Sequence, residues 1–455
     1  MHQTQLNAST ALHRTYSRWR SWVAASPLRT MGHGALVAAS ASLFARILGF
    51  CKEIVVAAIF GLSGALDVYL LAFVLIGMPL SILLNAVQTA LIAHLAAGHD
   101  NEETGKHFST TCILTLTLLA IILPVWLMLL PHLLPWLAAG FPPDKRQALE
   151  TALIWLVPYY FLNGFNLLAY GALQAKRRFL VNGLLPSATP MAIMICVYLW
   201  GASGGWRVLV IALTAGVAIE SGLLLVLLAQ MGLLAWPSAF RSIKAISLAS
   251  LALLPGTLVL AFGPLVEQAI AAALGEGSNA ALAYGYKLPS TLQGVLVTAI
   301  GITALPYFSA QIARGEYTYC LYSLNKLARV LLVGGALLVL PLSLFSPDIA
   351  ALLYQRGAFS VDATARVAPV QTAYFIQIPL ALVAMLGIRT LAALNRNGLL
   401  SLYTGLGMLL QALLAYAFAV RYGLSGIAWA AVIVSALMAI SAYLSARRTL
   451  RELSR

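Results

Sequence analysis

The stretch SASLFARILGFCKE, residues 40–53, decides the fold, because it places Arg46, Lys52 and Glu53 in an otherwise apolar helix that runs on to Phe60. A charge at bilayer depth costs about 2.5–3.5 kcal/mol on insertion scales, so it normally faces water or a partner. Arg46 and Glu53 are seven residues apart and lie on nearly the same helical face, about 10 Å apart along the axis. The pattern favours one wall of a polar cavity; the alternative is an internal ion pair that only fixes packing.

The composition is that of a polytopic membrane protein. Of the 455 residues, 61% are hydrophobic and 9% are charged, and the mean hydropathy is +0.89, whereas soluble domains contain about 25% charged residues. The net charge of +14 would suggest a nucleic-acid partner in a soluble protein. In a membrane protein it is better explained by Lys and Arg in loops that stay in the cytoplasm, so no nucleic acid is expected.

Apolar runs long enough to span a bilayer, which takes about 20 residues, recur along the chain. They predict an all-α polytopic membrane protein with about twelve transmembrane helices, at residues 34–61, 66–97, 108–138, 149–174, 181–201, 207–231, 246–273, 279–310, 326–346, 367–394, 399–420 and 424–446. The end of the second run, Thr89-Ala90-Leu91, resembles the end of the eighth, Thr303-Ala304-Leu305. This favours two six-helix lobes of the same orientation, a common transporter plan, with a cavity between them.

The expected domain organisation follows from these runs. It comprises an N-terminal tail at 1–33, an N-terminal lobe at 34–231, an inter-lobe linker at 232–245, a C-terminal lobe at 246–446 and a C-terminal tail at 447–455. Successive loops between membrane-spanning helices lie on alternate sides of the membrane. With the loops assigned in this way, the side that contains the two tails has roughly three times as many Lys and Arg residues as the other side. By the positive-inside rule, both termini and the linker are expected in the cytoplasm.

Depth separates the other charged side chains of the membrane region. Asp67 lies near the outer end of its helix and Arg389 near the inner end of its own, so either can snorkel to an interface. Glu220 lies near the middle of its helix and is either a protonated, hydrogen-bonded structural carboxyl or a proton or cation site. Lys287 lies about 12 Å into its helix and is expected to line the cavity.

The usual signatures of enzymes are missing from the sequence. It contains no phosphate-binding loop for ATP, no HExxH zinc motif and no nucleophile elbow. His94, His99 and His107, with Asp100 and two glutamates nearby, match none of the recurring zinc spacings and indicate a solvated loop. We therefore expect no enzyme activity, no catalytic residue, no metal and no cofactor; transport is expected to be coupled to the membrane potential, H⁺ or Na⁺.

Several motifs resemble the MurJ/MviN family of lipid II flippases. ARILGFCKE at 45–53, then Phe60-Gly61, Asp67 and Ala72-Phe73, resembles that family's S-R-x-L-G-F-x-R-D, F-G, D-A and A-F pattern. Further similarity lies at 284–288, YGYKL, and at 355–359, QRGAF. The resemblance covers most of the chain in the right order.

The resemblance implies the MOP-superfamily (MATE-like) fold, with two six-helix lobes around a cationic cavity that opens alternately to either side. The family's cavity cations correspond to Arg46, Lys52 and Lys287. Supporting or coupling roles then fall to the other charged residues of the helices, Glu53, Asp67, Glu220 and Arg389.

The implied location is the bacterial cytoplasmic (inner) membrane, among membrane lipids. The implied partner is a polyprenyl-linked glycan with a pyrophosphate headgroup, for peptidoglycan or another cell-envelope polysaccharide. The enzymes that synthesise such polysaccharides are further expected partners.

Departures from the family pattern leave the substrate open. Leu80-Ser81 and Leu84-Asn85-Ala86-Val87 replace the family's second-helix arginines and its A-E-G-A segment, and Asn395-Arg396-Asn397-Gly398 replaces D-T-R-T-P. The family's two C-terminal helices, which line a groove for the lipid tail, are not expected in a chain of this length. Lipid II and an exopolysaccharide or O-antigen unit are therefore comparable candidates. The alternatives are a MATE-like multidrug/cation antiporter, which predicts an acidic cavity, and a non-transporting scaffold.

Overall fold

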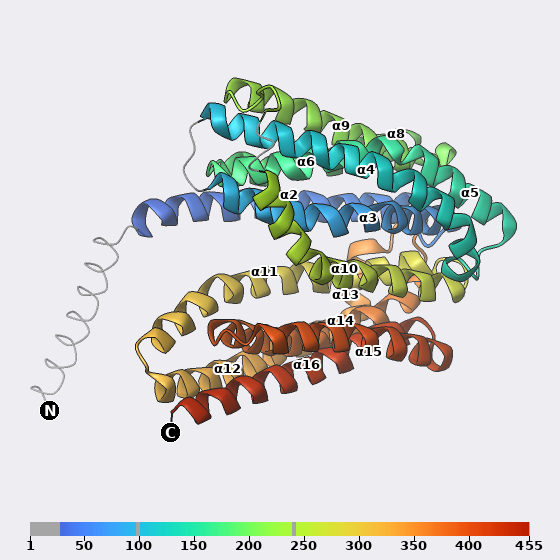
Figure 1. Ribbon diagram of the computed structural model, residues 1–455. Coiled ribbons are helices and arrows are strands. Elements are labelled where there is room, and N and C mark those ends of the chain that lie inside the picture. Colours follow the sequence, from blue (N-terminus) through green and yellow to red (C-terminus); the bar gives the residue numbers. More distant parts are fainter. Residues whose placement is uncertain (1–27, 97–100, 239–242, 455) are drawn as a thin grey trace, which may run out of the picture.

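The computed structural model describes residues 28–96, 101–238 and 243–454, and every regular element in these ranges is a helix (Figure 1). The first part of the chain forms α2 (Leu28–Phe60), α3 (Gly64–Leu95), α4 (Asn101–Leu137), α5 (Pro143–Trp155), α6 (Val157–Ala175), α7 (Phe179–Leu184), the short 3₁₀ helix η1 (Leu185–Ser187), α8 (Ala188–Gly204) and α9 (Trp206–Gln230). The second part forms α10 (Ile243–Ala273), α11 (Ser278–Ala313), α12 (Tyr317–Leu344), α13 (Ser346–Tyr354), α14 (Val361–Ala393), α15 (Asn397–Tyr422) and α16 (Leu424–Leu453). Such helices satisfy their backbone hydrogen bonds internally, as lipid requires.

The helices confirm an all-α polytopic membrane fold. Within the described residues, 10 helices are long and apolar enough to cross a membrane, or 11 if α5 and α6 form one bent span. The chain bends by 46° between these two helices, and Pro158, at the start of α6, lacks the N–H that a continuous helix would use. Together with α2, which is 33 residues long and carries Arg46, Lys52 and Glu53 in its apolar part, this agrees with the expected number of about twelve.

Two long helices organise the packing. α3 packs against α4, α5, α6, α9 and α10, whereas α14 packs against α11, α12, α13, α15 and α16. Small residues bring these helices close together, as is usual in membranes: a methyl group on Gly387 of α14 would lie 2.9 Å from the backbone of Ala442 in α16. Each long helix is thus the centre of its half of the molecule.

α10 lies between the two halves. Figure 1 shows α2–α9 on one side and α11–α16 on the other, with α10 crossing between them. α10 packs along α3 and also touches α15 and α11, and the Thr257 hydroxyl donates to the Ile82 carbonyl oxygen at 2.8 Å. The division into lobes at 34–231 and 246–446 therefore remains a proposal, with α10 forming part of the contact between them.

The described residues include only part of each expected tail. Residues 1–27 of the expected N-terminal tail lie outside the described residues, and α2 begins at Leu28. α16 continues to Leu453, so the helix extends into the segment 447–455 that was expected as a tail. The short helix α13 lies between α12 and α14.

Candidate functional site

The structure joins Lys52, Glu53 and Lys287 in one cluster. The Glu53 carboxylate lies 2.8 Å from Lys52 Nζ on α2 and 2.7 Å from Lys287 Nζ on α11. The side chain of Glu53 is 17% exposed, and those of Lys52 and Lys287 are 19% and 36% exposed. One half-buried carboxylate is thus shared by two cations that come from opposite halves of the chain.

These three residues line a cavity of about 350 Å³. Its walls come from α2, α3, α8, α9, α10 and α11, and they combine the charged cluster with apolar, aromatic and hydroxyl side chains, among them Val56, Tyr69, Phe73, Thr189, Ile193, Leu213 and Tyr286. A mostly apolar cavity with a few convergent polar groups is typical of a ligand site.

Arg46 lies against α11 two helical turns away from this cluster. A methyl group built on Gly294 would lie 3.2 Å from Arg46 Nη1, so the guanidinium occupies the space that this glycine leaves. Gly294 is seven residues from Lys287, which corresponds to about 10 Å along the helix. The sequence predicted one site for Arg46, Lys52 and Lys287. Lys52 and Lys287 meet at Glu53, and Arg46 lies against α11 about 10 Å further along that helix, so the single site remains a proposal.

Arg389 continues the same arrangement from α14. A methyl group on Gly301 would lie 3.3 Å from Arg389 Nη2, and Gly301 is a further seven residues along α11. Arg389 Nε is buried, with no hydrogen-bond partner in the part of the chain that the structure describes. Residues 287, 294 and 301 therefore mark three successive levels of one helix face, each with a cationic group beside it; we call this the cationic face of α11.

The charges of this face are unevenly compensated. Glu53 serves the two lysines, but within the described ranges neither Arg46 nor Arg389 forms an ion pair with a carboxylate. Two guanidinium groups beside glycines therefore offer unused planar donors, which match phosphate oxygens well.

Asp67 has a different environment, at the other end of the cavity wall. Its fully buried carboxylate accepts hydrogen bonds from the backbone N–H groups of Gly277, at 2.6 Å, and Ala280, at 3.0 Å. In return, the Glu276 carboxylate accepts from the Gly64 N–H at 2.8 Å. The N-terminus of α11 is thus capped by an acid of α3, and the N-terminus of α3 by an acid of the turn before α11, as the exposed amides and the helix dipole favour.

Further contacts hold this end closed. Lys145 Nζ lies 3.8 Å from Asp67 and 3.5 Å from Glu276, and the Ala358 N–H donates to the Ala58 carbonyl oxygen at 2.7 Å. We call these contacts, with the reciprocal caps, the closed end. Lys145 and Glu276 were missed by sequence reasoning because Lys145, in the first turn of α5, and Glu276, in the turn before α11, come together only through the fold.

The motifs Phe60-Gly61 and QRGAF meet at the closed end. Gly61 and Gly357 both have positive φ, 52° and 58°. A methyl group on Gly61 would lie 2.4 Å from the Ala358 oxygen, and one on Gly357 would lie 2.1 Å from the Ala58 oxygen. The backbones of the two segments lie too close together at these positions for a side chain, and the positive φ angles also favour glycine.

Glu220 is buried in the first half of the molecule, next to the cavity wall. Its carboxylate accepts from the Thr189 N–H at 3.1 Å, from the Thr189 hydroxyl at 2.5 Å and from the Tyr170 hydroxyl at 3.0 Å. All three donors are neutral, and Thr189 itself lines the cavity.

Among the described residues, no group of three or more His, Cys, Asp or Glu side chains is arranged to hold a metal ion.

The comparisons with known proteins agree with this architecture. The sequence model of the family described as "Lipid II flippase MurJ" matches residues 56–454. A relative from Synechocystis sp., described as a probable lipid II flippase MurJ, is 25% identical over 440 residues, covering 89% of this chain and 79% of the relative.

Solved structures share the fold. A lipid II flippase MurJ in an inward-closed conformation superimposes with a TM-score of 0.79 at 17% identity, over 92% of this chain and 90% of the other. An inward-facing MATE-family multidrug transporter of the MOP superfamily gives 0.74 at 17% identity, over 92% and 98%. The fold is therefore that of the MOP superfamily. Because the family match spans most of the sequence, the chain belongs to the MurJ lipid II flippase family, whose members are multi-pass membrane transporters and not enzymes.

Proposed function

We propose that this protein moves a polyprenyl-pyrophosphate-linked glycan precursor, lipid II or an exopolysaccharide or O-antigen unit, from the inner to the outer leaflet of the cytoplasmic membrane. The observation that carries the proposal is the cationic face of α11, where Lys287, Arg46 and Arg389 lie at levels two turns apart. The three levels span about 20 Å of a hydrocarbon core about 30 Å thick. A pyrophosphate headgroup can be passed along such a path.

The chemistry of these cations fits a pyrophosphate. Arg46 and Arg389 can each donate two parallel hydrogen bonds to phosphate oxygens, which are stronger than bonds between neutral groups. Lys287 and Lys52 share Glu53, so an arriving phosphate competes with that carboxylate for the lysines. This competition supports release of the headgroup as well as its capture.

The closed end supports alternating access. In the proposed topology it faces the outside, so we infer that access to the cavity from the outside is closed in this state. Passage to the other state requires Asp67 to leave the Gly277 and Ala280 amides and Ala358 to leave Ala58. All these contacts join α2 or α3 to α11 or to the turns before α11 and α14, so they can break together when the two halves rotate against each other.

The membrane potential is a sufficient driving force for an anionic headgroup. An inside-negative potential favours outward movement of negative charge by about 2.3 kcal/mol per charge per 100 mV. Coupling to H⁺ or Na⁺ is the alternative, and Glu220 is the buried carboxyl that such coupling would use. The proposed site residues for the substrate remain Arg46, Lys52 and Lys287, with Glu53, Asp67, Glu220 and Arg389 in supporting roles.

A MATE-like drug/cation antiporter is disfavoured by the same observation, because cationic drugs call for an acidic cavity. The test is reconstitution in proteoliposomes with three labelled compounds: a polyprenyl-pyrophosphate glycan, the same glycan on an uncharged polyprenol, and a lipophilic cation. We expect only the pyrophosphate compound to be moved. Movement of the cation alone would support the antiporter, and movement of none would support a scaffold.

The identity of the glycan is tested in the same vesicles. Lipid II and a lipid-linked exopolysaccharide unit carry the same pyrophosphate, so the cationic face of α11 does not distinguish them. A rate difference between the two compounds would show which sugar the rest of the cavity accepts.

A further inference from the structure

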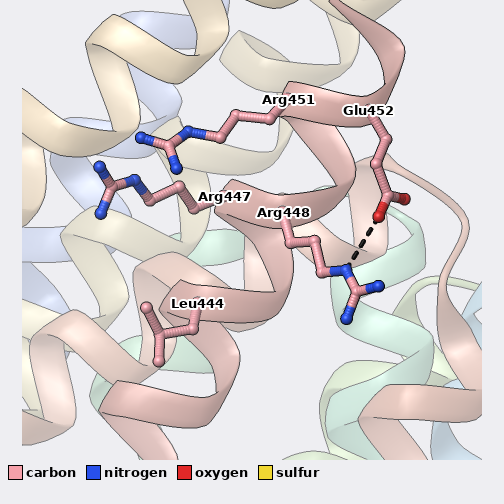
Figure 2. Close-up of a pocket in the computed structure, with 5 residues that line it drawn as sticks. All are labelled: Leu444, Arg447, Arg448, Arg451 and Glu452. Carbon is pink, nitrogen blue, oxygen red and sulfur yellow. Dashed lines mark hydrogen bonds and ion pairs between the residues drawn. The ribbon is translucent and has the colours of Figure 1, made fainter.

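A second pair of unpaired arginines lies outside the cavity, near the end of α16. Arg447, Arg448 and Arg451, with Leu444 and Glu452, line a pocket of about 400 Å³. Figure 2 shows Arg447 and Arg451 extending to the same side of the helix, whereas Arg448 points away and pairs with Glu452 at 2.9 Å. Glu452, the acid of this pocket, therefore pairs with Arg448, and the guanidinium groups of Arg447 and Arg451 lie together on the other side of the helix.

Neither member of this pair is neutralised. Within the described residues, no carboxylate lies at ion-pair distance from Arg447 or Arg451. Arg447 Nε is also buried without a hydrogen-bond partner there. Two adjacent guanidinium groups without a carboxylate produce a local excess of positive charge, which a phosphate oxygen cluster satisfies best.

An apolar groove lies next to this pocket, between α12, α14 and α16. Its volume is about 410 Å³, and its lining includes Leu332, Val383, Ala436 and Ile440. Residues 440, 444, 447 and 451 follow one another at helical spacing, so the groove and the arginine pocket lie along one side of α16. Leu444, 51% exposed, stands between them.

The polar groups of the groove are Arg329, Asn325 and Tyr443. Arg329 Nε donates to the Asn325 carbonyl oxygen at 3.3 Å, and the Tyr443 hydroxyl donates to the Asn325 side chain at 2.7 Å. Tyr443 and Asn325 thus join α16 to α12 one turn before Arg447. Apolar surface on one side and cations on the other are the two halves of a site for an amphipathic anion.

We propose that this surface binds an anionic glycerophospholipid, with its phosphate between Arg447 and Arg451 and one acyl chain over Leu444 in the α12–α16 groove. A lipid fits better than a free phosphate because an apolar groove lies along the same side of α16 as the arginine pocket. Basic clusters where a transmembrane helix leaves the membrane attract anionic headgroups by about 1 kcal/mol per Lys or Arg. The site is separate from the cavity and does not depend on the proposed substrate.

Native mass spectrometry of the purified full-length protein tests the proposal, with dioleoyl phosphatidylglycerol and dioleoyl phosphatidylcholine as probes. We expect preferential binding of phosphatidylglycerol, weakened about fivefold by Arg447→Gln and by Arg451→Gln, the factor that corresponds to about 1 kcal/mol. Arg448→Gln is the matched control, because it removes the same charge from the same turn but from an arginine engaged with Glu452. It should leave the preference nearly unchanged.

A second variant tests the acyl-chain half of the site. Ala436→Phe should fill the groove and weaken phosphatidylglycerol binding while all the arginines remain. Each variant is compared with the unmodified protein in melting temperature, and Arg451→Gln, at an exposed position, keeps the test valid if Arg447→Gln does not fold.

Three outcomes would overturn the proposal. Equal weakening by Arg448→Gln would mean diffuse surface charge rather than a site. The absence of any preference for phosphatidylglycerol over phosphatidylcholine would remove the site altogether. Displacement of the lipid by millimolar inorganic phosphate, with no effect of Ala436→Phe, would assign the arginines to a free anion.

Discussion

Arg46 shows how a single residue type carries the proposed chemistry. Its guanidinium lies in the space left by Gly294 and has no carboxylate at ion-pair distance in the described part of the chain. A planar fork in that position can grip a phosphate with two hydrogen bonds, whereas an ammonium group cannot. The identity of the side chain therefore matters beyond its charge.

Arg46→Lys is accordingly expected to impair transport although it keeps the charge. A hydrogen bond between charged groups contributes about 1.5–3 kcal/mol, so loss of one should weaken binding of the lipid-linked glycan roughly tenfold to a hundredfold. Lys52→Arg is the control on the same helix and should be tolerated. Binding of the labelled lipid to detergent-solubilised protein measures both; equal affinity for Arg46→Lys and unmodified protein would count against phosphate recognition at Arg46.

Glu220 supports a second prediction at the residue scale. Its carboxylate is held by Thr189 and Tyr170, and Thr189 lines the cavity. If this carboxyl binds the coupling ion, Glu220→Gln should remove the dependence of transport on a proton or sodium gradient while leaving the protein folded. Transport rates are measured with each gradient imposed across proteoliposomes. An unchanged gradient dependence would make Glu220 a structural carboxyl.

At the scale of the helix, α11 depends on glycines at two levels. Leucine at position 294 would occupy the space that holds the Arg46 guanidinium, so Gly294→Leu should displace that group and reduce transport by at least tenfold. Gly334→Leu on α12 is the matched control, because nothing lies within 4 Å of a methyl group built there and the residue is exposed. Flipping assays compare the two; similar rates would show that Arg46 does not act at that level.

The reciprocal caps of α3 and α11 lead to a prediction about conformational state. Asp67→Asn leaves one acceptor oxygen for two backbone donors, a loss of about 1–3 kcal/mol that weakens the closed end. The outward-open population should rise, measured as labelling of cavity cysteines from outside the vesicle. Asp362→Asn, also in the first turn of a helix but exposed, is the control. Identical labelling of the two variants would show that the Asp67 caps do not hold this end.

The sequence predicted the helices well because each apolar run has one use in a membrane. Most helix ends agree with the predicted runs to within a few residues, but α2, α4, α5, α12 and α14 begin about six to nine residues earlier than predicted, and α16 ends about seven residues later. The bend between α5 and α6 was not predicted, although Pro158 was visible. Pairing across helices was predicted less well, since Lys145 meets Asp67 and Glu276 only through the fold, and hydropathy carries no information on such contacts.

For the candidate site, too, the sequence identified residues but not the contacts between them. The charges of α2 and α11 were identifiable from their cost in lipid, and the family resemblance is confirmed by the match over residues 56–454. The positions of Arg46 and Arg389 along α11 could not be predicted from the sequence, because they depend on which helices face Gly294 and Gly301. Only the three-dimensional packing shows which arginine lies against each of these glycines.

At the scale of the whole molecule, the proposed topology places both termini and the 232–245 linker in the cytoplasm, because Lys and Arg are concentrated on that side. In a cysteine-free background, Ser203→Cys should react with an impermeant reagent added outside intact cells, and Ser238→Cys should not. Both side chains are exposed, so burial does not explain a difference. Labelling at 238 from outside would reverse the topology and the assignment of the closed end.

The central claim is that the cationic face of α11 carries an anionic headgroup, and outward flipping of a labelled polyprenyl-pyrophosphate glycan in proteoliposomes tests it most directly. Arg46→Ala and Lys287→Ala should each reduce both flipping and binding of that lipid by at least tenfold, because each removes a charge-assisted bond to phosphate. Arg421→Ala, an exposed arginine at the end of α15, should do neither. If Arg46→Ala and Lys287→Ala both flip and bind the lipid like the unmodified protein, the claim is wrong.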